Sequence, residues 1–169
     1  MAKRAAACRI RPGTAADAGI ILAHRRAMFE DIGHLDREAV NAMLMAYAVW
    51  LRRNLRKGTY HAWFATTGKG EVVAGAGLWI TEWPPVPSDV STTRGYVANV
   101  YTAPAHRRKG LARRLLKALL AWCRKEGLKT VTLHSSDDGV RLYESLGFRD
   151  IEPYRANPIP GARYMELAL

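Results

Sequence analysis

Hydrophobic and polar residues along the chain follow two different periods, and each period predicts one kind of element. In the first third of the chain, apolar residues recur at helical spacing, which predicts helices over residues 15–30 and 36–57. Thr14 and Asp17 have nearly the spacing of a capping box at the first helix. Asp36 is a suitable N-cap for the second helix.

After the second helix the hydrophobic period falls to two, which is typical of strands. Residues 60–66 and 72–80 are expected to form a hairpin around the turn at 67–70. Residues 95–102 form a third predicted strand. The stretch before it, 81–94, is rich in proline and is expected to be the longest irregular loop.

The C-terminal part of the chain alternates between helix and strand. Its predicted elements are a helix at 109–126, a strand at 130–134, a short helix at 138–146, a strand from Gly147–Phe148 and a last strand at 162–168. With a short first strand around Ile10, the order is β-α-α-β-β-β-α-β-α-β-β. This order predicts an α/β (α+β) fold with a mixed central sheet and helices on both faces. No linker is long enough to divide the chain, so a single domain is expected over residues 1–169.

The composition narrows the class of protein. Hydrophobic residues make up 49% of the chain and charged residues 24%, which is typical of a globular domain and excludes a disordered or fibrous one. The two cysteines, Cys8 and Cys123, have no metal or redox spacing and indicate a reducing compartment. Because the sequence has neither a signal-peptide pattern nor an apolar run of bilayer length, we expect a cytoplasmic protein that does not enter a membrane.

The charge balance is strongly basic, with a formal net charge of +11. Such a charge attracts anions, so nucleic acid, an acidic membrane surface and a phosphorylated cofactor are all candidate partners. Basic residues are spread over several predicted elements and form no recognised nucleic-acid-binding motif. A basic nucleic-acid-binding module is therefore the lesser alternative.

A basic glycine loop joins the third predicted strand to the next helix. Its sequence is Arg107-Arg108-Lys109-Gly110-Leu111-Ala112. Unpaired N–H groups and the dipole at a helix start attract phosphate, and a glycine lets the backbone approach an anion closely. The P-loop and dinucleotide-binding glycine signatures are absent, which argues against an NTPase or a dehydrogenase. The loop is predicted to bind phosphate, with a solvated basic turn as the alternative.

Two motifs in this region resemble those of the GNAT superfamily of N-acetyltransferases. The pattern Arg107-x-x-Gly110-x-Ala112 after a strand resembles the coenzyme A loop of that family. A second match to the family is Leu142-Tyr143-Glu144-x-Leu146-Gly147-Phe148. The resemblance covers roughly residues 95–152. It implies an acyltransferase that uses acetyl-CoA as co-substrate without a metal, and a mostly antiparallel sheet with one splayed parallel strand pair.

The resemblance also implies roles for individual residues. In the family, the strands that match 95–102 and 130–135 separate and admit the pantetheine arm of coenzyme A. Tyr143 is then expected to be the general acid that protonates the departing thiolate. The residues expected to contact coenzyme A are Val100, Tyr101, Thr102, Arg107, Arg108, Lys109, Gly110, Leu111, Ala112, Ser135, Asp138 and Tyr143.

The main departure from the family concerns the general base. Many members carry a glutamate on the strand that matches 95–102, whereas here that strand has no carboxylate, and Asn99 can only position a water. Glu82 is our first choice of base, because Trp79 and Trp83 beside it could form a wall for the acceptor. The other candidate bases are Glu30, Asp31 and His34. The missing glutamate also keeps open a catalytically weak acyl-CoA-binding regulator.

The acceptor implied by the resemblance is a primary amine of a small molecule or peptide. A hydrolase triad of Ser135, Ser136 or Asp137 with His134 is excluded, because neighbouring residues on a strand face opposite ways and no nucleophile elbow is present. Edge strands and the C-terminal strand would support a homodimer.

Overall fold

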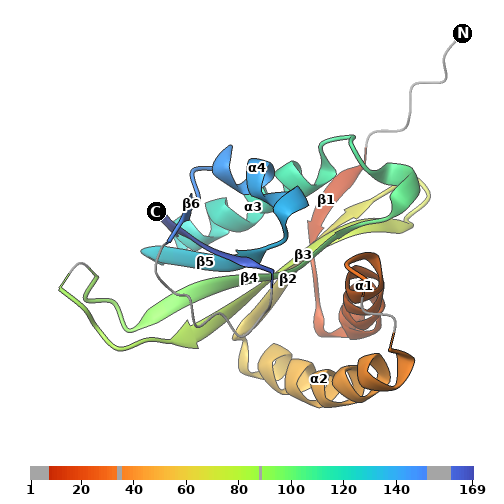
Figure 1. Cartoon of the computed structure of the whole chain (residues 1–169), viewed down its shortest axis with the longest axis horizontal. Coiled ribbons are helices and arrows are strands. Elements are labelled where there is room, and N and C mark those ends of the chain that lie inside the picture. The colour runs from red at the N-terminus through yellow and green to blue at the C-terminus, as the bar shows by residue number, and fades with distance from the viewer. Residues whose placement is uncertain (1–7, 34–35, 88, 152–160) are drawn as a thin grey trace, which may run out of the picture. The chain divides into compact units, whose positions relative to one another are not determined.

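The computed structural model describes residues 8–33, 36–87, 89–151 and 161–169 (Figure 1). In these residues the helices are α1 (Ala18–Asp31), α2 (Arg37–Lys57), α3 (Leu111–Lys125), α4 (Asp137–Glu144) and the short 3-10 helices η1 (Ala15–Asp17) and η2 (Pro104–His106). The strands are β1 (Arg9–Pro12), β2 (Tyr60–Thr66), β3 (Val72–Glu82), β4 (Thr93–Thr102), β5 (Thr130–Ser135), β6 (Arg149–Asp150) and β7 (Arg163–Ala168). The element order expected from the sequence is confirmed.

The strands of the described residues pair in the order β1-β2-β3-β4-β5-β7-β6. β4 and β5 run parallel, whereas β1 with β2, β5 with β7 and β6 with β7 are antiparallel. The expected α/β fold with a mostly antiparallel sheet and one parallel pair is thereby confirmed. The parallel ladder joins Gly95–Val97 to Val131–Leu133, and β4 continues beyond it to Thr102.

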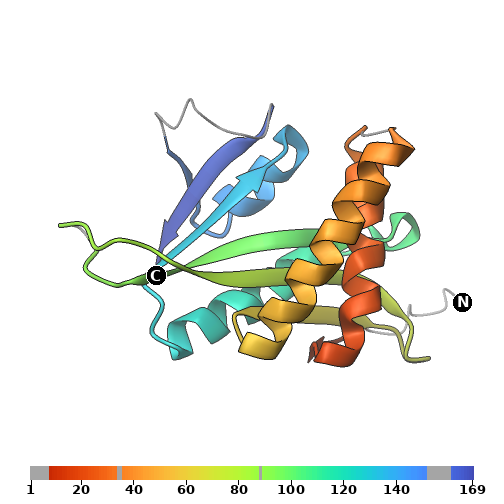
Figure 2. The same cartoon turned by 90° about the horizontal axis from the view of Figure 1, so that it is seen from below.

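The chain divides into two compact units, the first of which comprises residues 1–77 and 99–119. In its described part α1 and α2 lie side by side, as both views show (Figures 1 and 2), and α2 contacts β2. α2 is capped at its start by Asp36, whose carboxylate accepts hydrogen bonds from the backbone, and at its end by the left-handed Gly58. The fully buried side chains of this unit include Leu51, Phe64, Val73, Leu115, Leu116 and Leu119.

The second unit comprises residues 78–98 and 120–169. In its described part, β5 pairs with β7 along its whole length, and α4 contacts β5. Cys123 is fully buried in this unit, where it packs as a small apolar residue. The other fully buried side chains include Leu78, Val131, Leu133, Phe148 and Met165.

The irregular stretch expected at 81–94 is shorter in the structure. β3 extends to Glu82 and β4 begins at Thr93. The Trp83 N–H donates to the Thr92 carbonyl at 2.9 Å, so strand pairing continues beyond the expected ends. The prolines therefore fall in a hairpin loop between two long strands.

Two helix boundaries also differ from those expected, and glycines with a left-handed backbone explain both. Gly110 has a φ angle of 75°, which a helix does not allow, so α3 begins at Leu111 and not at residue 109. Gly147, with a φ angle of 95°, follows the end of α4 at Glu144. A left-handed glycine just beyond a helix is a common C-terminal stop.

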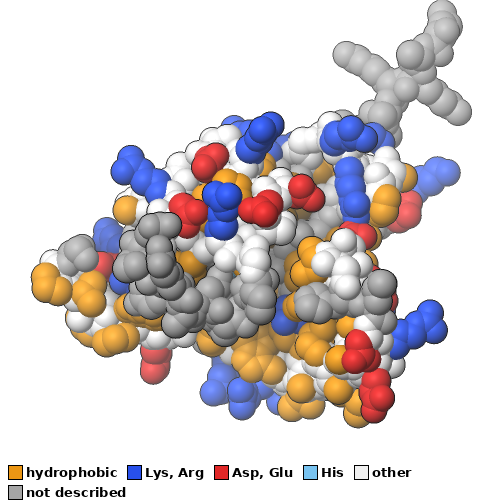
Figure 3. Space-filling model, viewed as in Figure 1, with side chains coloured by type: hydrophobic (Ala, Val, Ile, Leu, Met, Phe, Trp, Pro, Cys, Tyr) orange, Lys and Arg blue, Asp and Glu red, His pale blue; other side chains and the backbone are white. Residues whose placement is uncertain are grey.

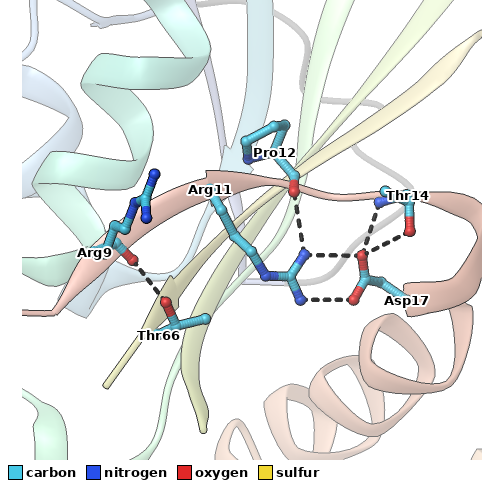
Figure 4. A network of polar contacts seen from close by, with 6 residues as sticks. All are labelled: Arg9, Arg11, Pro12, Thr14, Asp17 and Thr66. Carbon is cyan, nitrogen blue, oxygen red and sulfur yellow. Dashed lines mark hydrogen bonds and ion pairs between the residues drawn. The ribbon is translucent and has the colours of Figure 1, made fainter. Parts of the chain in front are cut away.

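A buried carboxylate ties β1 to the start of the first helical segment (Figure 4). Arg11 donates to both oxygens of Asp17, with Nη2 2.7 Å from Oδ1 and Nη1 3.0 Å from Oδ2. The N–H of Thr14 donates to the same carboxylate at 2.8 Å, which completes the expected capping box. The hydrogen bonds from Arg11 lower the pKa of Asp17 from the usual 3.8 to about 2.

Replacement of Asp17 by asparagine is expected to lower the free energy of unfolding by about 2 kcal/mol at neutral pH. The stabilisation is present above the unfolded pKa of 3.8 and is lost as the pH falls through about 2. Urea unfolding at pH 7 and pH 3 should therefore show a smaller difference between Asp17→Asn and wild type at the lower pH. The exposed Glu71→Gln serves as the control. A difference that does not change with pH would contradict the ion-pair explanation.

The surface charges are dispersed on the face shown in Figure 3. Among its described side chains, lysines and arginines stand apart, with acidic and apolar side chains between them. Within the described ranges, no helix combines the length and the apolar character that a membrane span requires.

Candidate functional site

The loop between β4 and α3 has a backbone conformation that suits an anion. Arg108 and Gly110 have φ angles of 58° and 75°, on either side of Lys109. Such left-handed residues in a turn form a nest, in which successive N–H groups converge on an anion. Among the described residues, the N–H groups of 108–110 have no recorded acceptor, and the first turn of α3 adds its own unpaired N–H groups.

The basic side chains of this loop have different partners. Arg107 donates from Nε to the Thr102 carbonyl at 2.9 Å, and its guanidinium forms an ion pair with Asp31 at the end of α1. Lys109 donates to the carbonyl of Ala105 at 2.8 Å. The Arg108 side chain has no recorded partner within the described residues, so it is available to a ligand. Arg107 instead ties the loop to α1.

The residues that flank the nest are arranged by packing. Leu111 is 5% exposed and begins the apolar face of α3, while Ala112 beside it is half-buried. On the strand side, Val100 and Tyr101 are half-buried, and the ring of Tyr101 lies 4.9 Å from that of His24. Packing therefore holds the backbone at both ends of the loop, through Tyr101 before it and Leu111 after it.

Asn99 interrupts the extended backbone of β4. Its φ angle is 53°, a left-handed value that asparagine tolerates better than most residues. The side chain is buried, and its Oδ1 accepts a hydrogen bond from Arg25 at 2.9 Å. Its Nδ2 donates to the hydroxyls of Tyr47 at 2.7 Å and Tyr60 at 2.8 Å. Burial raises the pKa of Tyr60, so its hydroxyl stays protonated.

A small cavity of about 10 Å³ lies next to Asn99, with room for about one water. His24 and Tyr60 also line it. His24 is 9% exposed, and burial lowers its pKa, which keeps the imidazole neutral at pH 7. The absence of a side chain at Gly75 makes room for this ring, since a Cβ there would lie 2.8 Å from the histidine Nδ1.

In the second unit, Tyr143 is a buried tyrosine on α4. It is 8% exposed, and its ring packs edge-on against that of Phe148, with 5.8 Å between the ring centres. The absence of a side chain at Gly139 leaves room for the ring, because a Cβ there would lie 3.1 Å from the tyrosine Cε2. Burial, with a contribution from Tyr96, raises the pKa of Tyr143 well above its usual value. The hydroxyl is therefore a proton donor, and no hydrogen bond within the described residues occupies it.

Ser135 and Asp138, the other residues of this unit that are expected to contact coenzyme A, differ in exposure. Ser135 is 1% exposed, and its hydroxyl donates to the carbonyl of Ser136 at 2.7 Å. Asp138 is exposed in the first turn of α4, with no recorded hydrogen bond to a described residue. Ser135 thus shapes the start of α4, whereas Asp138 is open to solvent.

Tyr96 and His134 form a hydrogen-bonded pair that the sequence did not reveal. The Tyr96 hydroxyl lies 2.8 Å from Nδ1 of His134, across the parallel pair β4 and β5. The His134 ring also contacts the ring of Tyr164 on β7 at 5.2 Å. Each residue is unremarkable alone on a strand, and only the strand register brings the phenol and the imidazole together.

A family model described as the acetyltransferase (GNAT) family matches residues 26–148. The chain belongs to this family. A solved GCN5-related N-acetyltransferase from Ralstonia eutropha JMP134 is 33% identical, with a TM-score of 0.82 over 91% of this chain and 99% of that one. A predicted acetyltransferase from Clostridium acetobutylicum, solved with acetyl-CoA, shares the fold at 20% identity, with a TM-score of 0.77 over 90% of this chain and 99% of that one.

An uncharacterized N-acetyltransferase of Schizosaccharomyces pombe is 37% identical over 73 residues, which are 41% of this chain and 45% of that protein. The chain spans about half the length of the curated relatives it matches. Family membership confirms the resemblance seen in the sequence, and the chain contains a GNAT acetyltransferase domain. Among the described residues, no cluster of histidine, cysteine, aspartate and glutamate is arranged to hold a metal ion.

The expected bases of this GNAT domain are scattered. Glu82 is exposed at the end of β3, where a broad open hollow of about 430 Å³ is also lined by Trp83. The guanidinium of Arg94 covers the Trp83 ring at 4.5 Å, so this tryptophan is already stacked. Two other candidate bases face arginines, Glu30 opposite Arg26 and Asp31 opposite Arg107. His34 lies outside the described residues.

Proposed function

We propose that this GNAT domain, as a single catalytic domain over residues 1–169, transfers the acetyl group of acetyl-CoA to a primary amine of a small molecule or peptide. The observation that carries the proposal is the nest at Arg108 and Gly110, whose free N–H groups precede a helix start in an acetyltransferase family. A pyrophosphate would accept hydrogen bonds from these groups, and the unpaired Arg108 side chain would add a charge-assisted bond. Backbone groups from Val100 to Thr102 would hold the pantetheine arm.

The proposed reaction is direct attack of the amine on the thioester. The acceptor nitrogen forms a bond to the acetyl carbon, and the bond from that carbon to sulfur breaks. Tyr143 donates its phenolic proton to the departing thiolate, a role open to a buried tyrosine whose hydroxyl has no recorded hydrogen bond to a described residue. Bulk solvent then returns a proton to Tyr143.

The acceptor nitrogen must also lose a proton, and the Tyr96–His134 pair is the best-supported group to receive it. With Nδ1 unprotonated, His134 accepts a hydrogen bond from the Tyr96 hydroxyl. The phenolic proton passes to Nδ1 as the Tyr96 oxygen takes a proton from the amine, so the imidazole holds the extra proton at the end of the step. Glu82 is the alternative base, directly or through a water. Asn99 is a positioning residue, since an amide does not accept a proton at neutral pH.

Acetyl-CoA is expected to raise the melting temperature of the protein, whereas a DNA oligonucleotide is not. Arg108→Glu should weaken coenzyme A binding by about tenfold, because the charge reversal acts on the phosphates. Titration calorimetry with coenzyme A, and with pantetheine as a ligand without phosphates, measures both effects. Release of free thiol with a panel of amines then tests transfer itself.

Lys125→Glu, at the exposed far end of α3, makes the same change in net charge and is the matched control. It should leave coenzyme A affinity nearly unchanged. If Arg108→Glu and Lys125→Glu lose coenzyme A affinity equally, the loss comes from the change in net charge and not from a contact of Arg108. The absence of any stabilisation by acetyl-CoA would rule out the proposed donor, and stabilisation by DNA alone would favour the nucleic-acid alternative.

A further inference from the structure

Arg25 carries a charge that no described carboxylate neutralises. Other arginines of the described structure do pair with acids, namely Arg11, Arg26, Arg94, Arg107 and Arg163. Arg25 donates instead to neutral groups, from Nη1 to Oδ1 of Asn99 at 2.9 Å and from Nε to the sulfur of Met43 at 3.3 Å. Its Nη2 has no recorded acceptor among the described residues. The guanidinium therefore keeps both its charge and free donors.

The surroundings of Arg25 hold the guanidinium in one orientation. It lies 4.0 Å from the centre of the Tyr47 ring and 5.1 Å from that of Phe29. Asn99 cannot turn its oxygen away, because its Nδ2 already donates to the hydroxyls of Tyr47 and Tyr60. A side chain fixed in this way loses little freedom when a ligand binds, so the site is preorganised for an anion.

The position of Arg25 in the first unit links it to the donor. Asn99 directly precedes Val100, where the backbone is proposed to hold the pantetheine arm. α1, which carries Arg25, also ends in Asp31, the ion-pair partner of Arg107 in the phosphate loop. The guanidinium is thus attached to the same strand and the same helix that position the donor.

We propose that Arg25 binds a carboxylate of the acceptor, so that the acceptor is an amino acid or a related amine that also carries a carboxylate. The inference rests on the proposed acetyl transfer and names the class of acceptor for it. A carboxylate matches the planar guanidinium with two oxygens, and the half-buried position of Arg25 makes the pairing stronger than it would be in open solvent. Asn99 and Tyr47 act as positioning residues for this arginine.

The test is a binding measurement with product analogues, made with and without coenzyme A. The probes are the N-acetyl derivatives of a small, an aliphatic, an aromatic and a basic amino acid, each matched with its own carboxamide, and N-acetyl phosphoethanolamine. In wild type, at least one acid should bind about tenfold or more tightly than its amide, because the amide loses the charge-assisted bond. The phosphorylated probe should bind less tightly than that acid.

Variants at position 25 assign the preference to the arginine. Arg25→Gln keeps a donor for Asn99 but removes the charge, and should make the acid and the amide equal. Arg25→Lys keeps the charge and should retain part of the preference. Arg26→Gln, at the next residue on α1, changes the net charge by the same amount and should keep the full preference for the acid over its amide.

Equal affinity for every acid and its amide in wild type would overturn the proposal, and so would a full preference in Arg25→Gln. Tighter binding of the phosphorylated probe would assign the site to a phosphate instead and equally overturn it. These outcomes are separate from a failure of acetyl transfer, which is read from coenzyme A binding and thiol release. A structural role of Arg25 alone would lower stability in Arg25→Gln without an acid preference in wild type.

Discussion

Replacement of Tyr143 by phenylalanine is expected to lower kcat by about 100-fold, the lower end of what general acid catalysis contributes. The phenol is buried and its pKa is raised, so at neutral pH it is a proton donor and not a base. Phenylalanine keeps the ring, and with it the packing against Phe148. The loss should therefore fall on the chemical step, measured as thiol release at saturating acetyl-CoA.

Two further measurements separate this role from a structural one. The Kd of Tyr143→Phe for acetyl-CoA and its melting temperature should stay close to those of wild type. If donor binding or stability falls in proportion to kcat, Tyr143 packs the site and does not act as the acid. If kcat is unchanged, the thiolate leaves without a proton from Tyr143.

Loss of the proposed general base, the Tyr96–His134 pair, is expected to lower kcat about as much as Tyr143→Phe does. Tyr96→Phe and His134→Gln should each lower kcat by about 100-fold, because each removes one member of the hydrogen-bonded pair. The double variant should be little worse than either single one, since the two residues act as a unit. The matched variant Glu82→Gln should lose much less activity.

The pH dependence gives a second readout for this pair. Wild-type activity should fall as the pH drops through the titration of an imidazole, because protonated His134 cannot accept a proton. The neighbours of His134 among the described residues include the phenol groups of Tyr96 on β4 and Tyr164 on β7. The activity of His134→Gln should no longer show this fall at low pH. A profile that is unchanged in His134→Gln but altered in Glu82→Gln would assign the base to Glu82.

The sequence predicted the fold well because local patterns determine most of it. Asp36 and Gly58 mark both ends of α2, and their capping roles depend only on neighbouring residues. The strand period and the glycine loop likewise show in short windows. The boundaries that differed, at 81–94 and at the start of α3, depend on a cross-strand hydrogen bond and on the backbone angle of Gly110.

The site was predicted less completely, because its polar contacts join distant parts of the chain. The backbone loop and Tyr143 could be identified from a short motif. The pairing of Tyr96 with His134, and that of Arg25 with Asn99, depend on strand register and helix packing, to which no local pattern points. The sequence did show that the strand lacks a carboxylate, so that another group must serve as the base.

The left-handed backbone at Asn99 has a consequence for how acceptor choice can diverge within one fold. Few residues tolerate that conformation, and aspartate is among them. Aspartate has nearly the shape of asparagine, but it would place a carboxylate against Arg25 and cancel its charge. Under the proposed role of Arg25, a single amide-to-acid exchange would turn a site for amines that carry a carboxylate into one for neutral amines. Position 99 is thus a natural place for selection, or for a protein engineer, to change substrate range without rebuilding the scaffold.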